Sequence, residues 1–438
     1  MKSIDVVLFA TTLGLSAPPL GAQGEAMFRG DLAHTGAYAG PGVTRTPRVK
    51  WVFRTKGRVI STPAVANGVV YFGSTDGNVY AVDAESGRQR WAFTTEARVA
   101  SSPAVSDGLV YVESYDGALY ALDATTGKQA WKFATAGERR FAGKYLHEHL
   151  PRGETMPDPF DLYLSSPAVW RGAVYFGSGD GNVYALDART GRPRWTFRTG
   201  NVVHASPAIA NGTLFIGSWD SWLYALDAKT GKQKWRFKTG EDTVISNQVG
   251  IQSSASVMDG VVYFGCRDGH VYAVDAATGT QRWAFDVNGS WVNTSPAVRA
   301  GKVYVGTADS RTLYELDGKT GKPNFSLQFS WYFFASPAVA GNMVYAANWD
   351  GRLFGVDLAT RKVAWVFQTD SSRANLARHT KADGSMSFRA GMLEAGFYDG
   401  LVVAIDKIFG MGSFLSSPVI AGDVLYIGSM DGNLYALR

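Results

Sequence analysis

Short runs of alternating apolar and polar residues recur along the chain, and turns containing glycine separate them. In one stretch the runs occupy 62–66, 69–74, 78–84 and 89–95. Asn67-Gly68 and Asp76-Gly77 lie between the first three runs. Both dipeptides favour two-residue hairpins, because their residues accept positive φ. The period of two therefore predicts four consecutive antiparallel strands.

This four-strand unit repeats at about 40-residue intervals, a spacing typical of propeller blades. Seven complete copies each carry an aromatic residue in the fourth run, at Trp91, Trp131, Trp195, Trp235, Trp283, Phe325 and Trp365. An eighth copy begins at Ser416 and stops at Arg438 without its fourth run. The stretch KWVFRT at 50–55 resembles KWRFKT at 234–239 and fits as the missing strand. The sequence therefore predicts an all-β fold, an eight-bladed β-propeller of four-stranded antiparallel blades that the N-terminal strand closes.

Residues that recur in every copy are expected to build the blades rather than a site. The fourth-run aromatic can wedge between neighbouring blades and bury about 150–250 Å². The aspartate after each third run can accept backbone N–H groups in the following turn. These aspartates are Asp83, Asp123, Asp187, Asp227, Asp275, Asp317 and Asp357.

Composition and the N-terminus limit the partners and the compartment. The 438 residues are 18% charged, and the net charge of +5 includes no basic run, so nucleic acid is not expected as a partner. Cys266 is the only cysteine, so no internal disulfide and no cysteine-rich metal site is expected. Lys2, an apolar stretch at 6–15 and small residues up to Ala22 have the layout of a secretory signal over 1–22. We expect a soluble periplasmic or secreted protein with no transmembrane span.

Three segments carry a family resemblance. ALDATTGKQAW at 121–131, ALDARTGRPRW at 185–195 and ALDAKTGKQKW at 225–235 resemble the tryptophan-docking motif of the PQQ-like eight-bladed propellers. This family includes quinoprotein alcohol dehydrogenases and the periplasmic scaffold protein of the outer-membrane β-barrel assembly machine. The opening FRGDLAHTG at 28–36 is similar to the lead-in of these proteins. The resemblance implies one PQQ-like propeller domain over 27–438, which we expect to be a monomer.

Long departures from the repeat point to a functional face. They occupy 136–163, 240–251 and 370–414, and each connects a fourth strand to the next first strand. Such connections share one face of the disc, so we expect that face to be functional. His147 and His149 suit a metal by type, but two residues alone fit a solvated loop better, and no metal site is predicted. In 370–414, apolar residues at helical spacing predict a short helix over the disc, or one that binds a partner: Phe397, Leu401, Val402, Ile405 and Ile408.

One residue just before each first strand should crowd the axial mouth of the ring. These residues are Ile60, Ala100, Leu164, His204, Gln252, Asn293, Phe334 and Leu415. Convergent polar groups in an aromatic wall are typical of small-molecule sites. We therefore predict a ligand site formed by His204, Asn247, Gln252, Trp291, Asn293 and Trp331. The alternative is a mouth without ligand, whose side chains hydrogen-bond one another.

Three functions fit these observations to different degrees. The first is an exported, non-catalytic binding or scaffold protein of the cell envelope, whose decorated face binds an envelope protein or a small-molecule ligand. The alternative that the resemblance implies is a PQQ- and calcium-dependent dehydrogenase, with Asp158, Asp161 and Asp242 as loop carboxylates. Against it, the chain lacks the adjacent cysteines and the Cys-x-x-Cys-His haem motif of many such enzymes. A hydrolase or lyase is the third, but no Gly-x-Ser-x-Gly or His-Glu-x-x-His supports it, and no catalytic residue is assigned.

Overall fold

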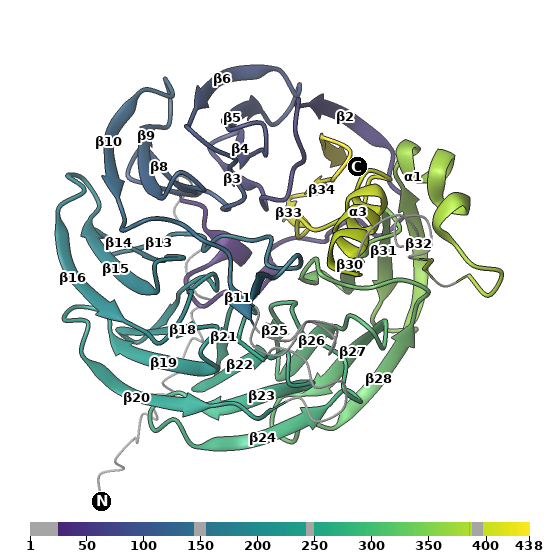
Figure 1. Cartoon of the computed structure of the whole chain (residues 1–438). Coiled ribbons are helices and arrows are strands. Elements are labelled where there is room, and N and C mark those ends of the chain that lie inside the picture. Colours follow the sequence, from purple (N-terminus) through teal and green to yellow (C-terminus); the bar gives the residue numbers. More distant parts are fainter. Residues whose placement is uncertain (1–24, 144–154, 242–248, 385, 388–396) are drawn as a thin grey trace, which may run out of the picture.

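Eight four-stranded antiparallel sheets form a closed ring of blades (Figure 1). The computed structural model describes residues 25–143, 155–241, 249–384, 386–387 and 397–438. The predicted signal at 1–22 and the residues His147, His149, Asp242 and Asn247 lie outside this part. The predicted all-β, eight-bladed architecture is confirmed.

Each blade runs from an inner strand to an outer one. Blades one to four are, in chain order, blade one with β3 (Ala64–Ala66), β4 (Val69–Gly73), β5 (Asn78–Asp83) and β6 (Gln89–Thr94); blade two with β7 (Ala104–Ser106), β8 (Leu109–Ser114), β9 (Ala118–Asp123) and β10 (Gln129–Ala134); blade three with β13 (Ala168–Trp170), β14 (Ala173–Gly177), β15 (Asn182–Asp187) and β16 (Pro193–Arg198); and blade four with β17 (Ala208–Ala210), β18 (Thr213–Gly217), β19 (Trp222–Asp227) and β20 (Gln233–Lys238). Blades five to eight are blade five with β21 (Ser256–Met258), β22 (Val261–Gly265), β23 (His270–Asp275) and β24 (Gln281–Asp286); blade six with β25 (Ala297–Arg299), β26 (Lys302–Gly306), β27 (Thr312–Asp317) and β28 (Pro323–Gln328); blade seven with β29 (Ala338–Ala340), β30 (Met343–Ala347), β31 (Arg352–Asp357) and β32 (Lys362–Gln368); and blade eight with β33 (Val419–Ala421), β34 (Val424–Gly428) and β35 (Asn433–Leu437).

The eighth blade takes its outer strand from the beginning of the chain, as the sequence predicts. Strand β2 (Val49–Arg54) pairs antiparallel with β35, and Trp51 lies opposite Ala436. The backbones of Arg48 and Arg438 add two further hydrogen bonds of 2.7 and 2.9 Å. The pairing of β2 with the C-terminal strand β35 therefore closes the ring.

The recurring tryptophan joins each blade to the next. The indole Nε1 of Trp195, for example, donates to the Ala228 carbonyl at 3.0 Å, and the ring covers Gly231 so closely that a Cβ there would lie 2.6 Å away. Blades six and seven depart from this rule. In blade six, Phe325 replaces the tryptophan where Arg361 replaces the glycine. In blade seven, Trp365 Nε1 donates to the Val43 carbonyl of the N-terminal segment at 3.0 Å. The predicted structural role of the fourth-run aromatic is therefore confirmed.

A ring of hydroxyl groups surrounds the axis. The backbone N–H of one residue in each blade donates to the side-chain oxygen of its counterpart in the next blade, at 2.8–3.1 Å. The eight residues are Thr62, Ser102, Ser166, Ser206, Ser254, Ser295, Ser336 and Ser417. This ring satisfies buried N–H groups that the short inner strands leave unpaired.

The axis also holds an N-terminal segment that the repeat does not predict. Residues 32–36 accept backbone hydrogen bonds from inner strands of blades four to seven, and β1 (Ala37–Tyr38) pairs parallel with β29. Near them, in the 3₁₀ turn η1 (Phe28–Gly30), the buried Arg29 side chain donates to the carbonyls of Pro337 and Pro296 at 2.7 and 2.8 Å. The segment therefore ties several blades to one another at the centre of the ring.

The insertions place two short helices and a small hairpin on the ring. In the first insertion β11 (Ala142–Gly143) pairs with β12 (Met156–Pro157). The third contains α1 (Asp370–Asn375), the 3₁₀ helix η2 (Leu376–His379) and α3 (Phe397–Phe409). Helix α3 confirms the predicted helix, and its buried side packs onto Trp349, whose ring centroid lies 4.9 Å from that of Phe409. Among the described helices, none has the length and apolar character needed to cross a membrane.

Candidate functional site

The eight residues predicted to crowd the axial mouth do converge there. All of them surround one cavity together with the hydroxyl ring, and its volume is about 40 Å³. A cavity of this size has room for ordered water but is far smaller than the about 300–1,000 Å³ of sites for drug-sized molecules. The side chains at the mouth therefore mostly contact one another.

An arginine that the sequence analysis did not select organises one half of the mouth. The guanidinium of Arg267 lies between the rings of Trp219 and Trp291, 4.3 and 4.1 Å from their centroids. It donates to Asp158, to Gln252 Oε1 at 3.0 Å and to Asn293 Oδ1 at 3.3 Å. Its side chain and that of Asp158 are completely buried. Stacking and hydrogen bonding thus balance the charge of Arg267 inside the protein.

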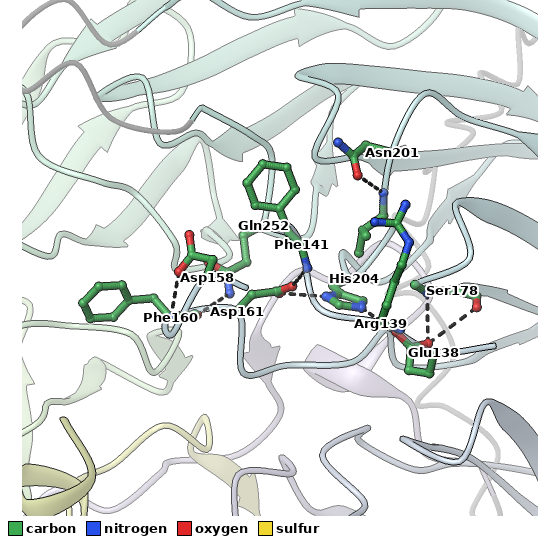
Figure 2. A network of polar contacts seen from close by, with 12 residues as sticks. Glu138, Arg139, Phe141, Asp158, Phe160, Asp161, Ser178, Asn201, His204 and Gln252 are labelled. Carbon is green, nitrogen blue, oxygen red and sulfur yellow. Dashed lines mark hydrogen bonds and ion pairs between the residues drawn. The ribbon is translucent and has the colours of Figure 1, made fainter. Parts of the chain in front are cut away.

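His204 organises the other half, between two carboxylates (Figure 2). Its Nδ1 lies 2.7 Å from Asp161 Oδ1 and its Nε2 lies 2.8 Å from Glu138 Oε1. Burial alone lowers the pKa of His204, but the two carboxylates outweigh burial and raise it to about 10. The imidazole is therefore a cation at neutral pH, and both ring nitrogens donate.

The first insertion supplies these carboxylates and is held down by the same contacts. Asp161 Oδ2 accepts from the backbone N–H of Phe141 at 2.6 Å, and the Phe141 ring stacks on Trp219 with centroids 4.3 Å apart. Gln252 Nε2 donates to the Phe160 carbonyl at 3.0 Å. The described part of the insertion therefore lies across the mouth as an ordered cover (Figure 2).

Glu113 adds an unusual carboxyl group near Glu138. Its Oε1 is buried without a hydrogen-bond partner among the described residues. Burial, with Glu138 and Asp180 nearby, raises the pKa of Glu113 well above its usual value. This environment favours the neutral form of Glu113.

The predicted site residues occupy different parts of this arrangement. His204, Gln252 and Asn293 belong to the polar network, Trp291 covers Arg267, and Trp331 is buried in an apolar cluster with α3 residues. Asn247 lies outside the described residues. This packing is closer to the alternative in which the mouth side chains bond one another.

Aligning the copies reveals two of the mouth residues that were not predicted, Arg267 and Glu113. Arg267 occupies the variable position of the second turn, where other copies have Thr75, Tyr115, Gly179, Trp219, Ala308, Trp349 and Met430. Glu113 stands where the other copies have glycine or alanine. Glu138 lies in the first insertion, where no repeat gives a reference.

A quinone with calcium does not fit the described mouth. Sites for drug-sized molecules enclose about 300–1,000 Å³, against about 40 Å³ here. Asp158 and Asp161, the described loop carboxylates proposed for calcium, already pair with Arg267 and His204. Among the described residues no group of three or more His, Cys, Asp or Glu side chains could hold a metal ion.

A second departure from the repeat lies on the outside of the ring. Within the described chain, the exposed hydrophobic side chains larger than alanine form what we name the valine patch: Val49, Val52, Val363, Val366, Val402 and Val403. Four of them lie on the outer strands β32 and β2 of blades seven and eight, and two lie on α3. These elements share one sector of the disc (Figure 1).

Comparison with the other six blades makes this sector distinct. In blades seven and eight, the outer strand carries valine at two positions. The first lies two residues before the docking aromatic and the second lies one residue after it. The corresponding pairs in blades one to six are Gln89 and Ala92, Gln129 and Lys132, Pro193 and Thr196, Gln233 and Arg236, Gln281 and Ala284, and Pro323 and Ser326. Exposed valines on an edge strand favour association, whereas charged side chains such as lysine oppose it.

Similar proteins share the whole ring. A protein family described as outer membrane protein assembly factor BamB matches residues 42–146, 160–284 and 267–411. The chain is similar to BamB from Moraxella catarrhalis, with 16% identity and a TM-score of 0.66 over 90% of this chain and 100% of that one. It is also similar to a europium-containing methanol dehydrogenase, with 16% identity and a TM-score of 0.70 over 95% and 98% of the two chains.

A quinohemoprotein alcohol dehydrogenase from Comamonas testosteroni gives 16% identity and a TM-score of 0.68, over 94% of this chain and 80% of that one. At this identity the likeness to these structures shows the fold alone. None of the curated proteins matches the chain.

Proposed function

The chain belongs to the family described as outer membrane protein assembly factor BamB, and from this premise we propose that it is an exported, non-catalytic binding protein of the cell envelope. The proposed partner is another envelope protein. The proposed contact surface is the valine patch on blades seven and eight and α3.

The valine patch is the observation that carries this proposal. Val49 is 47% exposed and Val366 is 42% exposed, although four of the other six blades carry a polar residue at each of these two positions. Their strands are also the outer edges of their sheets, with unpaired backbone groups. An extended partner segment can add to such an edge, its backbone forming hydrogen bonds and its side chains covering the valines.

The axial mouth supports the non-catalytic part of the proposal. A general acid or base must reach the group that it protonates or deprotonates. His204, Asp161, Arg267 and Asp158 have completely buried side chains that pair with one another. Their arrangement suits a rigid support for the covering insertion.

Site-specific photo-cross-linking in the native cell envelope tests the proposal. A benzophenone amino acid replaces Val52 or Val366, and in matched controls it replaces Thr196 or Arg236 at the equivalent positions of blades three and four. We expect the valine positions alone to capture one envelope protein. Binding of that purified protein should weaken about tenfold or more in the Val52→Lys, Val366→Lys double variant, as expected for central apolar contacts.

Three results would contradict this function. They are equal capture at all four positions, capture of a second copy of this chain, and an unchanged affinity of the double variant for the captured protein.

A further inference from the structure

A cavity of about 640 Å³ opens beside α3 and the valine patch. Its walls include the loop after β2, the loop after β6, the residues that flank β11 and β12 in the first insertion, the turn between β34 and β35, and α3. Val402 belongs both to the valine patch and to the cavity wall. The cavity therefore adjoins the α3 part of the proposed contact surface. Its volume lies within the about 300–1,000 Å³ of ordinary ligand sites.

Cations outnumber acids around this cavity. Its walls contain Lys56, Arg58, Arg98 and Arg140 against Asp406 and Asp431. Both acidic side chains already have a partner within the protein. Asp406 pairs with Arg58 at 2.8 Å, and Asp431 accepts from the Tyr435 hydroxyl at 2.9 Å.

Two half-buried arginines remain without an acidic partner. Among the described residues, no carboxylate pairs with Arg98 or Arg140. Arg98 is also fixed in place, because its guanidinium lies 3.8 Å from the centroid of the Tyr115 ring. A preorganised arginine of this kind can bind a carboxylate in two-pronged fashion.

Apolar side chains face the same cavity. Ile60, Ile405, Phe409 and Met430 are buried in the protein and contribute to its wall, with the partly buried Leu162 beside them. A ligand that contacts both the arginines and the apolar wall therefore needs an apolar body next to a negative charge.

We propose that this cavity binds an acidic, apolar peptide segment of the partner protein, with Arg98 and Arg140 holding its carboxylates. The inference rests on the proposed function and names the chemistry of the segment. The adjoining α3 part of the valine patch favours a peptide, because one extended chain can cover the valines and place acidic side chains against the arginines.

Calorimetric titration of the full chain with two capped peptides tests the inference. The first is acetyl-Glu-Phe-Asp-Leu-amide, and the second replaces its acids by Gln and Asn. We expect the acidic peptide to bind at least about tenfold more tightly, since charge-assisted bonds to arginine are about twice as strong as neutral ones. Its affinity should fall as salt is raised, because the contacts are partly exposed.

Variants assign the binding to the cavity. Arg98→Gln with Arg140→Gln should weaken the acidic peptide about tenfold, while Lys319→Gln with Lys322→Gln removes the same charge from an exposed turn of blade six and should change nothing. Unaltered thermal unfolding shows that the variants fold. Equal binding of the two peptides, equal loss in both variants, or binding of sodium decanoate without the peptide would each overturn the inference.

The two proposals fail separately. If cross-linking and the valine variants support partner binding but Arg98 and Arg140 have no effect on either peptide or partner, the cavity assignment alone is wrong. If the valine variants bind the partner normally, the proposed function fails, whatever the peptides do.

Discussion

The axial mouth and the valine patch both depart from the repeat, and they differ in how fully the rest of the chain contacts them. At the mouth, the side chains of His204, Asp161, Arg267 and Asp158 have no exposed surface, and each has a partner of opposite charge. On the rim, Val49, Val52, Val363 and Val366 are 38–47% exposed. The contrast indicates that the non-repeat residues at the axial mouth stabilise the fold, whereas the exposed valines on the rim are accessible to another molecule.

Electrostatics explains why the mouth must be complete. A buried charge is tolerated only when its partners replace the water that it has lost. Exposed valines carry no such requirement, since their cost is a tendency to associate. Substitutions should therefore act on stability at the mouth and on binding at the rim.

The largest expected effect on stability is at Arg267. Arg267→Met should lower the free energy of unfolding by about 3–5 kcal/mol, because Asp158 becomes a buried charge without a charged partner. Urea unfolding followed by tryptophan fluorescence measures the loss. Adding Asp158→Asn should recover part of it, and a single-variant loss below about 1 kcal/mol would contradict the account of the mouth.

His204 should make stability depend on pH. Its pKa is raised from 6.5 to about 10 in the folded chain, so the folded state holds a proton that the unfolded state loses above pH 6.5. This contribution is complete below pH 6.5 and disappears as the pH rises towards 10. We expect the melting temperature to fall across that window and to fall less in His204→Gln. Identical pH profiles of the two proteins would refute the ion pairs.

A smaller loss is expected at the repeated junctions. Trp195→Phe removes the hydrogen bond to the Ala228 carbonyl and should cost about 1 kcal/mol in urea unfolding. Blade six offers a natural reference, because Phe325 already lies there with Arg361 5.8 Å from its ring. Phe325→Trp should raise the free energy of unfolding only when it is combined with Arg361→Gly, because that substitution opens the space that the indole needs. Equal gains with and without Arg361→Gly would contradict this explanation.

The smallest effect on stability is expected at the rim. Val52→Lys with Val366→Lys should shift the free energy of unfolding by no more than about 0.5 kcal/mol per site, since both side chains are exposed. Urea unfolding compares this variant with Thr196→Lys, a substitution at the equivalent position of blade three. A large loss of unfolding free energy in the valine variant alone would contradict the account, because it would show that the valine patch stabilises the ring.

Periodicity explains how much of this could be predicted from the sequence. The eight blades, the closing strand β2 and the docking role of Trp195 each follow from a regular pattern, and each is present. The axial placement of His204, Gln252 and Asn293 followed from the same register. Long-range pairing could not be predicted in this way, because Arg267 and Asp158 are 109 positions apart and no repeat relates them.

Two further features had weaker signals in the sequence. The N-terminal segment around Arg29 precedes the first copy, so no register places it on the axis. The valine patch was visible in the sequence, but only the exposure of its side chains distinguishes it from ordinary strand residues.

Amide hydrogen exchange with and without the captured envelope protein tests the central claim most directly. The account predicts new protection in β2, β32 and α3, and unchanged exchange in β16 and β20, the equivalent strands of blades three and four. Protection confined to β16 and β20, or absent from all five elements in the complex, would contradict it.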